Sequence, residues 1–180
     1  MADRASTAAS VATERATAWT EWNETWALAV AFGLASVPWT YAFVVGLHLP
    51  LWPSFVASAS FFAAGGGLAS LVRGYLGNAL GIAYAVATLL VVGALGGGPL
   101  ALSLVVGAFM LLASLHAFIP RLGFAPAAFF GYATLFGVHA AGTSAFGATG
   151  LGGEAVAAIL AMLLGACIGL AVERIAETVA

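Results

Sequence analysis

The sequence predicts an all-α fold: a polytopic membrane bundle of six transmembrane helices, in two halves of three that form a possible 3+3 inverted repeat. One basis is composition, because 63% of the 180 residues are hydrophobic and only 7% are charged. Soluble domains carry about 25% charged residues, so a soluble fold of this composition could not cover its surface. The other is segmentation, since glycine, proline and arginine clusters divide the chain into apolar stretches. One crossing takes about 20 apolar residues, so six crossings fit within the 180.

The chain is expected to divide into three parts. Residues 1–25 form a cytoplasmic N-terminal tail with an interfacial amphipathic segment, residues 26–172 the six-helix transmembrane domain, and residues 173–180 a cytoplasmic C-terminal tail. The six spans are expected at 26–47, from 51 to an end at either 65–67 or 73, from that turn to 95, and at 100–119, 124–141 and 154–172.

Three tryptophans near the first span, Trp19, Trp22 and Trp26, fall on one face of a helix. One interpretation is an amphipathic helix lying in the membrane interface. The other is the ordinary enrichment of tryptophan at the level of the lipid headgroups.

Residues 51–81 (LWPSFVASASFFAAGGGLASLVRGYLGNALG) contain the central turn. Gly65, Gly66 and Gly67 each cost a helix about 1 kcal/mol relative to alanine, which favours a turn at these glycines and a short second span. A turn at Arg73 would instead give a full-length span with a glycine-weakened centre. Both alternatives are compatible with the sequence.

The arginines predict the orientation. With six spans, all five arginines lie in segments on one side of the membrane, whereas the three opposite loops carry no basic residue. Because basic residues are enriched in cytoplasmic loops, both termini are expected in the cytoplasm.

Two glycine pairs occupy equivalent places in the predicted halves: Gly77 and Gly81 in the third span, and Gly165 and Gly169 in the sixth. Small residues four apart allow helices to approach closely in lipid. Such pairs join helices within one subunit or between subunits, and a homo-oligomer is expected. Spans two and five would run in opposite directions, as an inverted repeat requires.

Catalysis is not expected, and neither is a metal or a cofactor. The only aspartate is Asp3, and His48, His116 and His139 are scattered, with no carboxylate at a useful spacing. Glu154 stands at the start of the sixth span, where a negative charge suits a helix N-terminus. A net charge of −2 with no basic patch predicts no nucleic-acid partner.

A few polar side chains fall at membrane depth and should face other helices or a wet cavity, because unpaired polar groups are costly in hydrocarbon. Asn78 serves either as a contact between helices or as a contact to a substrate, and His139 is expected at the interface. The protein is therefore expected to be a channel or transporter for a small neutral or weakly polar solute; the alternative is a non-transporting scaffold or accessory membrane protein. The candidate pore-lining residues are Asn78, Tyr84, Tyr132, Thr134 and His139.

Several stretches resemble the prokaryotic inner-membrane family known as domain of unknown function 1097 (DUF1097). They are residues 34–39 (LASVPW), residues 54–68 (SFVASASFFAAGGGL), the glycine-rich helix after Arg73, and residues 118–120 leading into 129–131. Some family members have a Cys-Pro pair where this chain has Ala63 and Ala64, so any role of that cysteine does not carry over. The resemblance implies a multi-spanning protein of the inner membrane of a prokaryote, with no assigned activity. Residues 73–81 also resemble the arginine/glycine signature of the fusaric-acid-resistance and aromatic-acid exporters.

Overall fold

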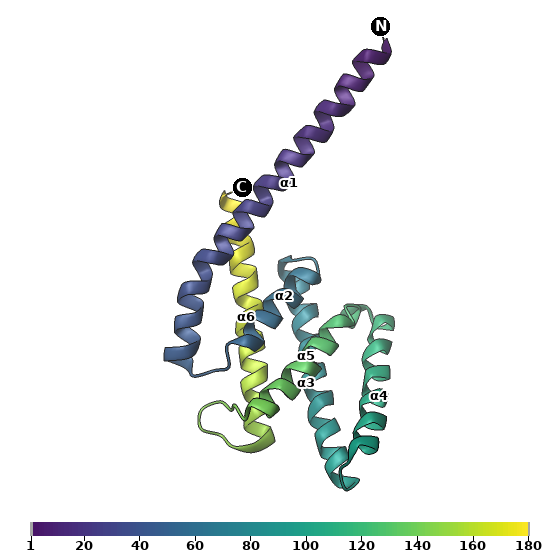
Figure 1. Ribbon diagram of the computed structural model, residues 1–180, viewed down its shortest axis with the longest axis vertical. Coiled ribbons are helices and arrows are strands. Elements are labelled where there is room, and N and C mark those ends of the chain that lie inside the picture. Colours follow the sequence, from purple (N-terminus) through teal and green to yellow (C-terminus); the bar gives the residue numbers. More distant parts are fainter. Residues whose placement is uncertain (1, 180) are drawn as a thin grey trace. The chain divides into compact units, whose positions relative to one another are not determined.

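A computed structural model describes the backbone of residues 2–179 and the side chains of residues 22–179. Every regular element in this part of the chain is helical (Figure 1). In order they are α1 (Ala2–Tyr41), the π-helical turn η1 (Ala42–Leu47), α2 (Trp52–Ala63), α3 (Gly67–Ala94), α4 (Pro99–Leu115), the 3-10 turns η2 (His116–Phe118) and η3 (Pro120–Leu122), α5 (Pro126–Ala141) and α6 (Gly150–Val179).

The chain forms two compact units, the first of which combines α1 up to Pro38 with the end of α6 from Ala171. Within it, the rings of Trp22 and Trp26 pack edge to face at 5.9 Å, and both are more than half exposed. The side chain of Trp19 lies outside the described residues, so the expected face of three tryptophans stays a prediction.

The second unit comprises Trp39–Leu170 and contains the short helices α2 and α5.

Four helical segments of the described chain are long and apolar enough to cross a membrane: Trp22–Leu47, Gly67–Ala94, Pro99–Phe118 and Gly150–Val179. The 12 residues of α2 and the 16 of α5 rise only about 18 and 24 Å, against a hydrocarbon core of about 30 Å. The protein is thus an all-α membrane protein, and the count of six spans stays a prediction.

The turn after α2 lies at the glycines. Helix α2 ends at Ala63, and Gly65, Gly66 and Gly67 have φ angles of 104°, 72° and 71°, which glycine adopts without steric cost. Helix α3 begins at Gly67, so Arg73 lies inside it. Of the two sequence alternatives, the structure has the short second segment.

Helix α6 is longer than the sequence indicated. It runs from Gly150 to Val179, whereas the sixth span was expected at residues 154–172. Residues 173–179, expected as a tail, therefore continue the helix, and Arg174 pairs with Glu177 at 2.8 Å on its exposed surface.

The core of the second unit depends on a close approach between α3 and α5. A Cβ atom added at Gly81 would overlap the carbonyl oxygen of Ala128, and one added at Gly131 would overlap the carbonyl oxygen of Asn78. At Gly77 an added Cβ would stand 2.6 Å from the Cβ of Ala127. The two backbones are therefore in direct contact, as glycine permits between membrane helices.

A second close approach joins α6 to α2. A Cβ at Gly165 would overlap the backbone of Ser54, and a Cβ at Gly169 would lie 3.0 Å from the ring of Phe61 and 3.1 Å from Oγ of Ser58. The structure thus places both glycine pairs that the sequence singled out at contacts between helices of one chain.

The α3–α5 contact predicts different outcomes for one substitution at two places in α3. Gly81→Ala should destabilise the fold by at least about 1–3 kcal/mol, because a methyl group there forces the backbones apart. Gly93→Ala should be neutral or stabilising, because nothing lies within 4 Å of an added Cβ and alanine favours the helix. Thermal unfolding in detergent, followed by circular dichroism, measures both. Equal midpoints for the two variants would contradict the contact.

Candidate functional site

The centre of the second unit holds Asn78, a buried amide on α3. The residue is 1% exposed, and within the described part of the chain its side chain makes a single, long hydrogen bond, 3.3 Å from Oγ of Ser60 to Oδ1. Its Nδ2 has no partner among the described residues. Exchanging the amide oxygen and nitrogen would only move the unpaired position to the other atom.

Two further buried hydroxyls lack partners in the described part of the chain, those of Ser58 on α2 and Thr134 on α5. Ser58 faces α6, because its Oγ would lie 3.1 Å from a Cβ atom added at Gly169, whereas Ser60 points from α2 toward Asn78. Thr134 lies about one helical turn after Gly131, which contacts the Asn78 carbonyl. We call Ser58, Asn78 and Thr134 the unpaired polar cluster, a name that refers to their shared lack of a partner and not to a contact between them; they lie on α2, α3 and α5, one on each helix.

A second set of polar groups further along α3 is largely paired. Oη of Tyr84 lies 2.8 Å from Nε2 of His116, and Oγ1 of Thr88 lies 2.8 Å from Oη of Tyr132. Thr88 also donates to the Tyr84 carbonyl at 2.8 Å, so the Tyr132 hydroxyl donates to Thr88. Nδ1 of His116 is buried without a partner in the described structure.

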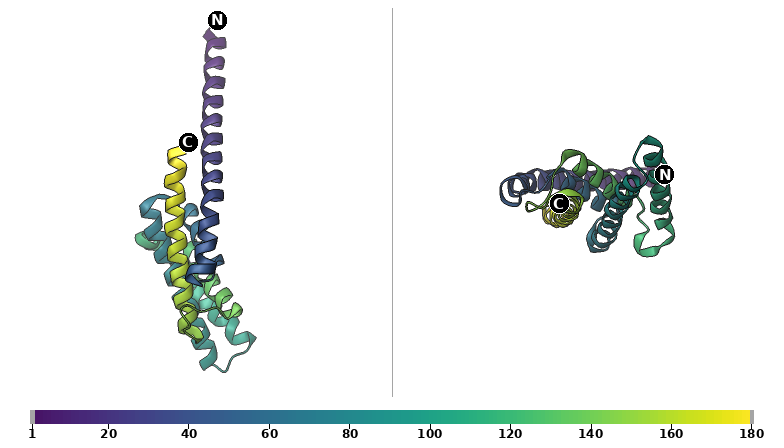
Figure 2. Two further views of the ribbon diagram at one scale, coloured as in Figure 1. Left: turned by 90° about the vertical axis from the view of Figure 1, so that its left-hand side faces the viewer. Right: turned by 90° about the horizontal axis from the view of Figure 1, so that it is seen from below.

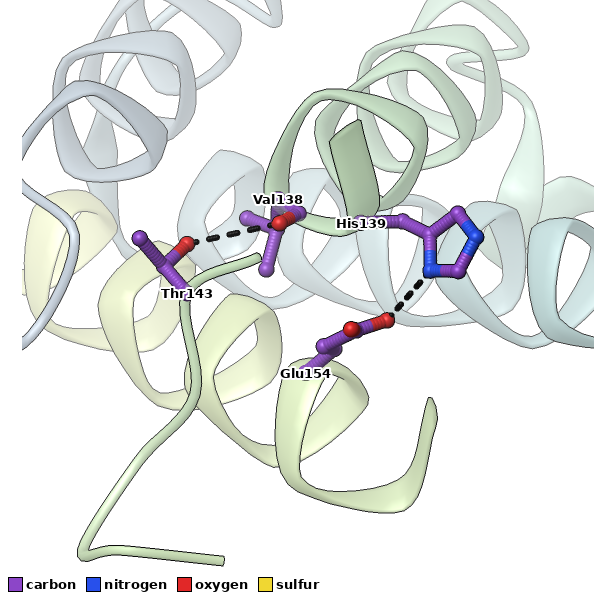
Figure 3. Close-up of polar contacts among 4 residues, drawn as sticks. All are labelled: Val138, His139, Thr143 and Glu154. Carbon is purple, nitrogen blue, oxygen red and sulfur yellow. Dashed lines mark hydrogen bonds and ion pairs between the residues drawn. The ribbon is translucent and has the colours of Figure 1, made fainter. Parts of the chain in front are cut away.

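His139 lies apart from this interior and forms a pair with Glu154 (Figure 3). Its Nδ1 lies 2.6 Å from Oε2 of Glu154, and the imidazole side chain is about half exposed, at 47%, whereas the carboxylate is 11% exposed. Beside the pair, Thr143 donates to the Val138 carbonyl at 3.4 Å where the chain leaves α5. The expectation that no histidine has a carboxylate companion is therefore wrong. The connection from α5 to α6 brings together two residues that are 15 apart in sequence.

Arg73 and Arg121 lie at one end of the second unit and line the same groove. The six-span scheme requires these two arginines to be on one side of the membrane. Arg73 also fixes the glycine turn, because its Nη2 donates to the Ala64 carbonyl at 2.9 Å.

The structure thus places four of the five candidate pore-lining residues in the interior and the fifth at an exposed helix end. Asn78, Tyr132 and Thr134 are buried and Tyr84 is partly buried, all in the interior, whereas His139 is exposed at the end of α5. The structure adds Ser58, Thr88 and His116 to the interior. The signal for these three in the sequence is weak, since serine and threonine can bond their own helix and His116 stands close to a predicted helix end.

The interior polar residues fall inside a family match. The family model described as "Protein of unknown function (DUF1097)" matches residues 27–177. The chain belongs to the DUF1097 family. The resemblance seen in the sequence is therefore confirmed over most of the chain, whereas the similarity to exporters has no support from this match. No curated protein and no solved structure matches the chain.

In this DUF1097 protein, the paired interior groups predict unequal costs for the same substitution. Tyr84→Phe should cost about 1–3 kcal/mol, because it leaves both nitrogens of the buried His116 unpaired. Tyr132→Phe should cost only about 0.5–1 kcal/mol, because Thr88 keeps its bond to the Tyr84 carbonyl. Unfolding midpoints in one detergent compare the two variants, and a larger loss for Tyr132→Phe would show the pairing to be different.

Proposed function

We propose that this protein is a membrane channel or transporter for a small neutral or weakly polar solute, and that the unpaired polar cluster contacts the solute. The observation that carries the proposal is the burial of three partnerless polar groups, Ser58, Asn78 and Thr134, on three helices. A buried polar group without a hydrogen bond costs about 2–7 kcal/mol in an apolar medium. Water or a solute passing between the helices would supply the missing partners.

The packing of the short helices supports an inverted repeat of two halves. In each close approach, the first glycine of the pair on a long helix lies over the residue that follows the proline in the first turn of a short helix: Gly77 over Ala127, and Gly165 over Ser54. Within the second unit, α3 and the first part of α6 run in opposite directions (Figures 1 and 2). Transporters built from inverted repeats bind their solutes where the repeats meet, often beside short or interrupted helices.

The chemistry of the cluster favours a neutral solute. Its members offer hydroxyl and amide groups and no charge, so an ion would lack a counter-charge there. The proposed activity involves no catalysis. The proposed assembly is a homo-oligomer, in which glycine contacts between copies of the chain would add to the glycine contacts within each copy. The shared groove of Arg73 and Arg121 agrees with these two arginines lying on one side of the membrane, which the positive-inside rule makes the cytoplasmic side and the six-span scheme makes the side of both termini. The proposed location is the inner membrane of a prokaryote, as the family resemblance implies.

A non-transporting scaffold is the second candidate, and the tight packing of the interior favours it. Asn78 and Thr134 are at most 1% exposed. A scaffold would tolerate loss of the unpaired groups, whereas a transporter would not.

Solute flux separates the two functions. Liposomes carrying the purified protein should equilibrate glycerol or urea faster than empty liposomes, measured by stopped-flow light scattering. Asn78→Leu should abolish this flux. Thr134→Val keeps the side-chain shape and should lower flux by about tenfold, a loss of about 1.4 kcal/mol. Its unfolding midpoint should stay the same or rise, because an unpaired buried hydroxyl has been removed.

The matched control is Ser103→Ala, which removes an exposed hydroxyl on α4 that bonds only the Pro99 carbonyl and should leave flux unchanged. Wild-type flux equal to that of empty liposomes for both solutes would favour the scaffold.

A further inference from the structure

A groove of about 330 Å³ lies where the start of α3 meets η3. Its walls combine apolar side chains with two guanidinium groups. The lining residues are Ala69, Val72, Arg73, Leu76, Pro120 and Arg121.

The two positive charges of this groove have no acidic partner among the side chains of residues 22–179. The sequence contains no aspartate or glutamate between residues 25 and 153. Among the described side chains, Arg121 is exposed and makes no hydrogen bond or ion pair. Arg73 bonds the neutral Ala64 carbonyl, and its Nε is buried without a partner in that same part of the chain. A negative group from outside the described chain would balance both charges.

The apolar part of the groove indicates where that group comes from. Val72 and Leu76 are 50% and 42% exposed beside the arginines, and the neighbouring Phe118 is 83% exposed. These side chains would be poorly placed in water, but they suit contact with acyl chains.

The depth of the groove agrees with the lipid headgroup level. The 28 residues of α3 rise about 42 Å, which exceeds the hydrocarbon core by about 12 Å. Shared between the two ends, this excess leaves about 6 Å of helix beyond the core at each end. Arg73 lies about 9 Å from the start of α3, and its long side chain can extend back to the interface.

We propose that this groove binds an anionic phospholipid. The phosphate accepts hydrogen bonds from Arg73 and Arg121, and the first methylenes of the acyl chains lie on Val72 and Leu76. The planar guanidinium is suited to phosphate because it donates two parallel hydrogen bonds. Basic pockets between membrane helices bind anionic headgroups in the same way. The acyl contact distinguishes a lipid from a free phosphate ion.

Native mass spectrometry of the detergent-purified full chain tests this site by titration with phosphatidylglycerol and with phosphatidylcholine of the same acyl chains. Phosphatidylglycerol should bind about tenfold more tightly. Arg121→Gln should remove this preference, whereas Arg121→Lys should keep part of it, because the charge remains and the bidentate geometry is lost. Arg121 is exposed without a hydrogen bond, so these variants should fold.

The matched control is Arg174→Gln, which makes the same charge change at an exposed arginine already paired with Glu177. It should leave the preference unchanged. Equal binding of the two lipids by the wild type, or an equal loss in Arg174→Gln and Arg121→Gln, would overturn the site. Competition by inorganic phosphate at the same concentration as the lipid would assign the groove to a free anion instead.

Discussion

Direct backbone contact between α3 and α5, at Gly81 and Gly131, is the constraint on which the second unit depends. In lipid, no hydrophobic force draws apolar helices together, so association needs close packing and hydrogen bonds. Each of the two glycines faces a backbone carbonyl of the other helix, and a single methyl group at either would separate them. The contact of Gly165 with Ser54 likewise brings the backbones of α6 and α2 together.

The polar interior follows from this contact. Because Gly131 allows α5 to lie on the backbone of Asn78, the amide of Asn78 is enclosed by protein, where a partner must come from a neighbouring helix. Ser60 supplies one long bond, and the remaining amide atom is left unpaired. Unpaired groups of this kind are rare in a membrane interior unless water or a ligand reaches them. The same packing that stabilises the fold therefore creates the unpaired polar group from which the proposed solute site is argued.

The sequence predicted the parts of this structure that depend on local chemistry. The three consecutive glycines favoured a turn at residues 65–67 while a turn at Arg73 stayed open, and the clusters of glycine, proline and arginine separated the apolar stretches that form the helices. The family was recognised from residues 54–68 and their neighbours. The length of α6 was underestimated, because Glu173 and Arg174 ended the apolar run without ending the helix.

Contacts between residues that lie far apart along the chain could not be predicted from the sequence. The pairing of His139 with Glu154 requires the connection from α5 to α6 to fold back, and no local pattern encodes that path. The importance of Thr134 lies in its missing partner, which only a three-dimensional arrangement reveals. Asn78 was recognised because an amide between two small residues stands out in an apolar helix, but its contact with α5 could not be inferred from spacing.

Opposite orientation of the two halves is tested most directly by labelling single cysteines from either side of the membrane in a Cys167→Ser background. Leu68→Cys and Gly123→Cys mark the exposed end with the arginines, whereas Leu95→Cys and Phe146→Cys mark exposed positions in the predicted opposite loops. Inverted halves predict that an impermeant maleimide reaches the first two positions from one side only and the last two from the other side only. Labelling of Leu68→Cys and Gly123→Cys from opposite sides would contradict the inverted arrangement.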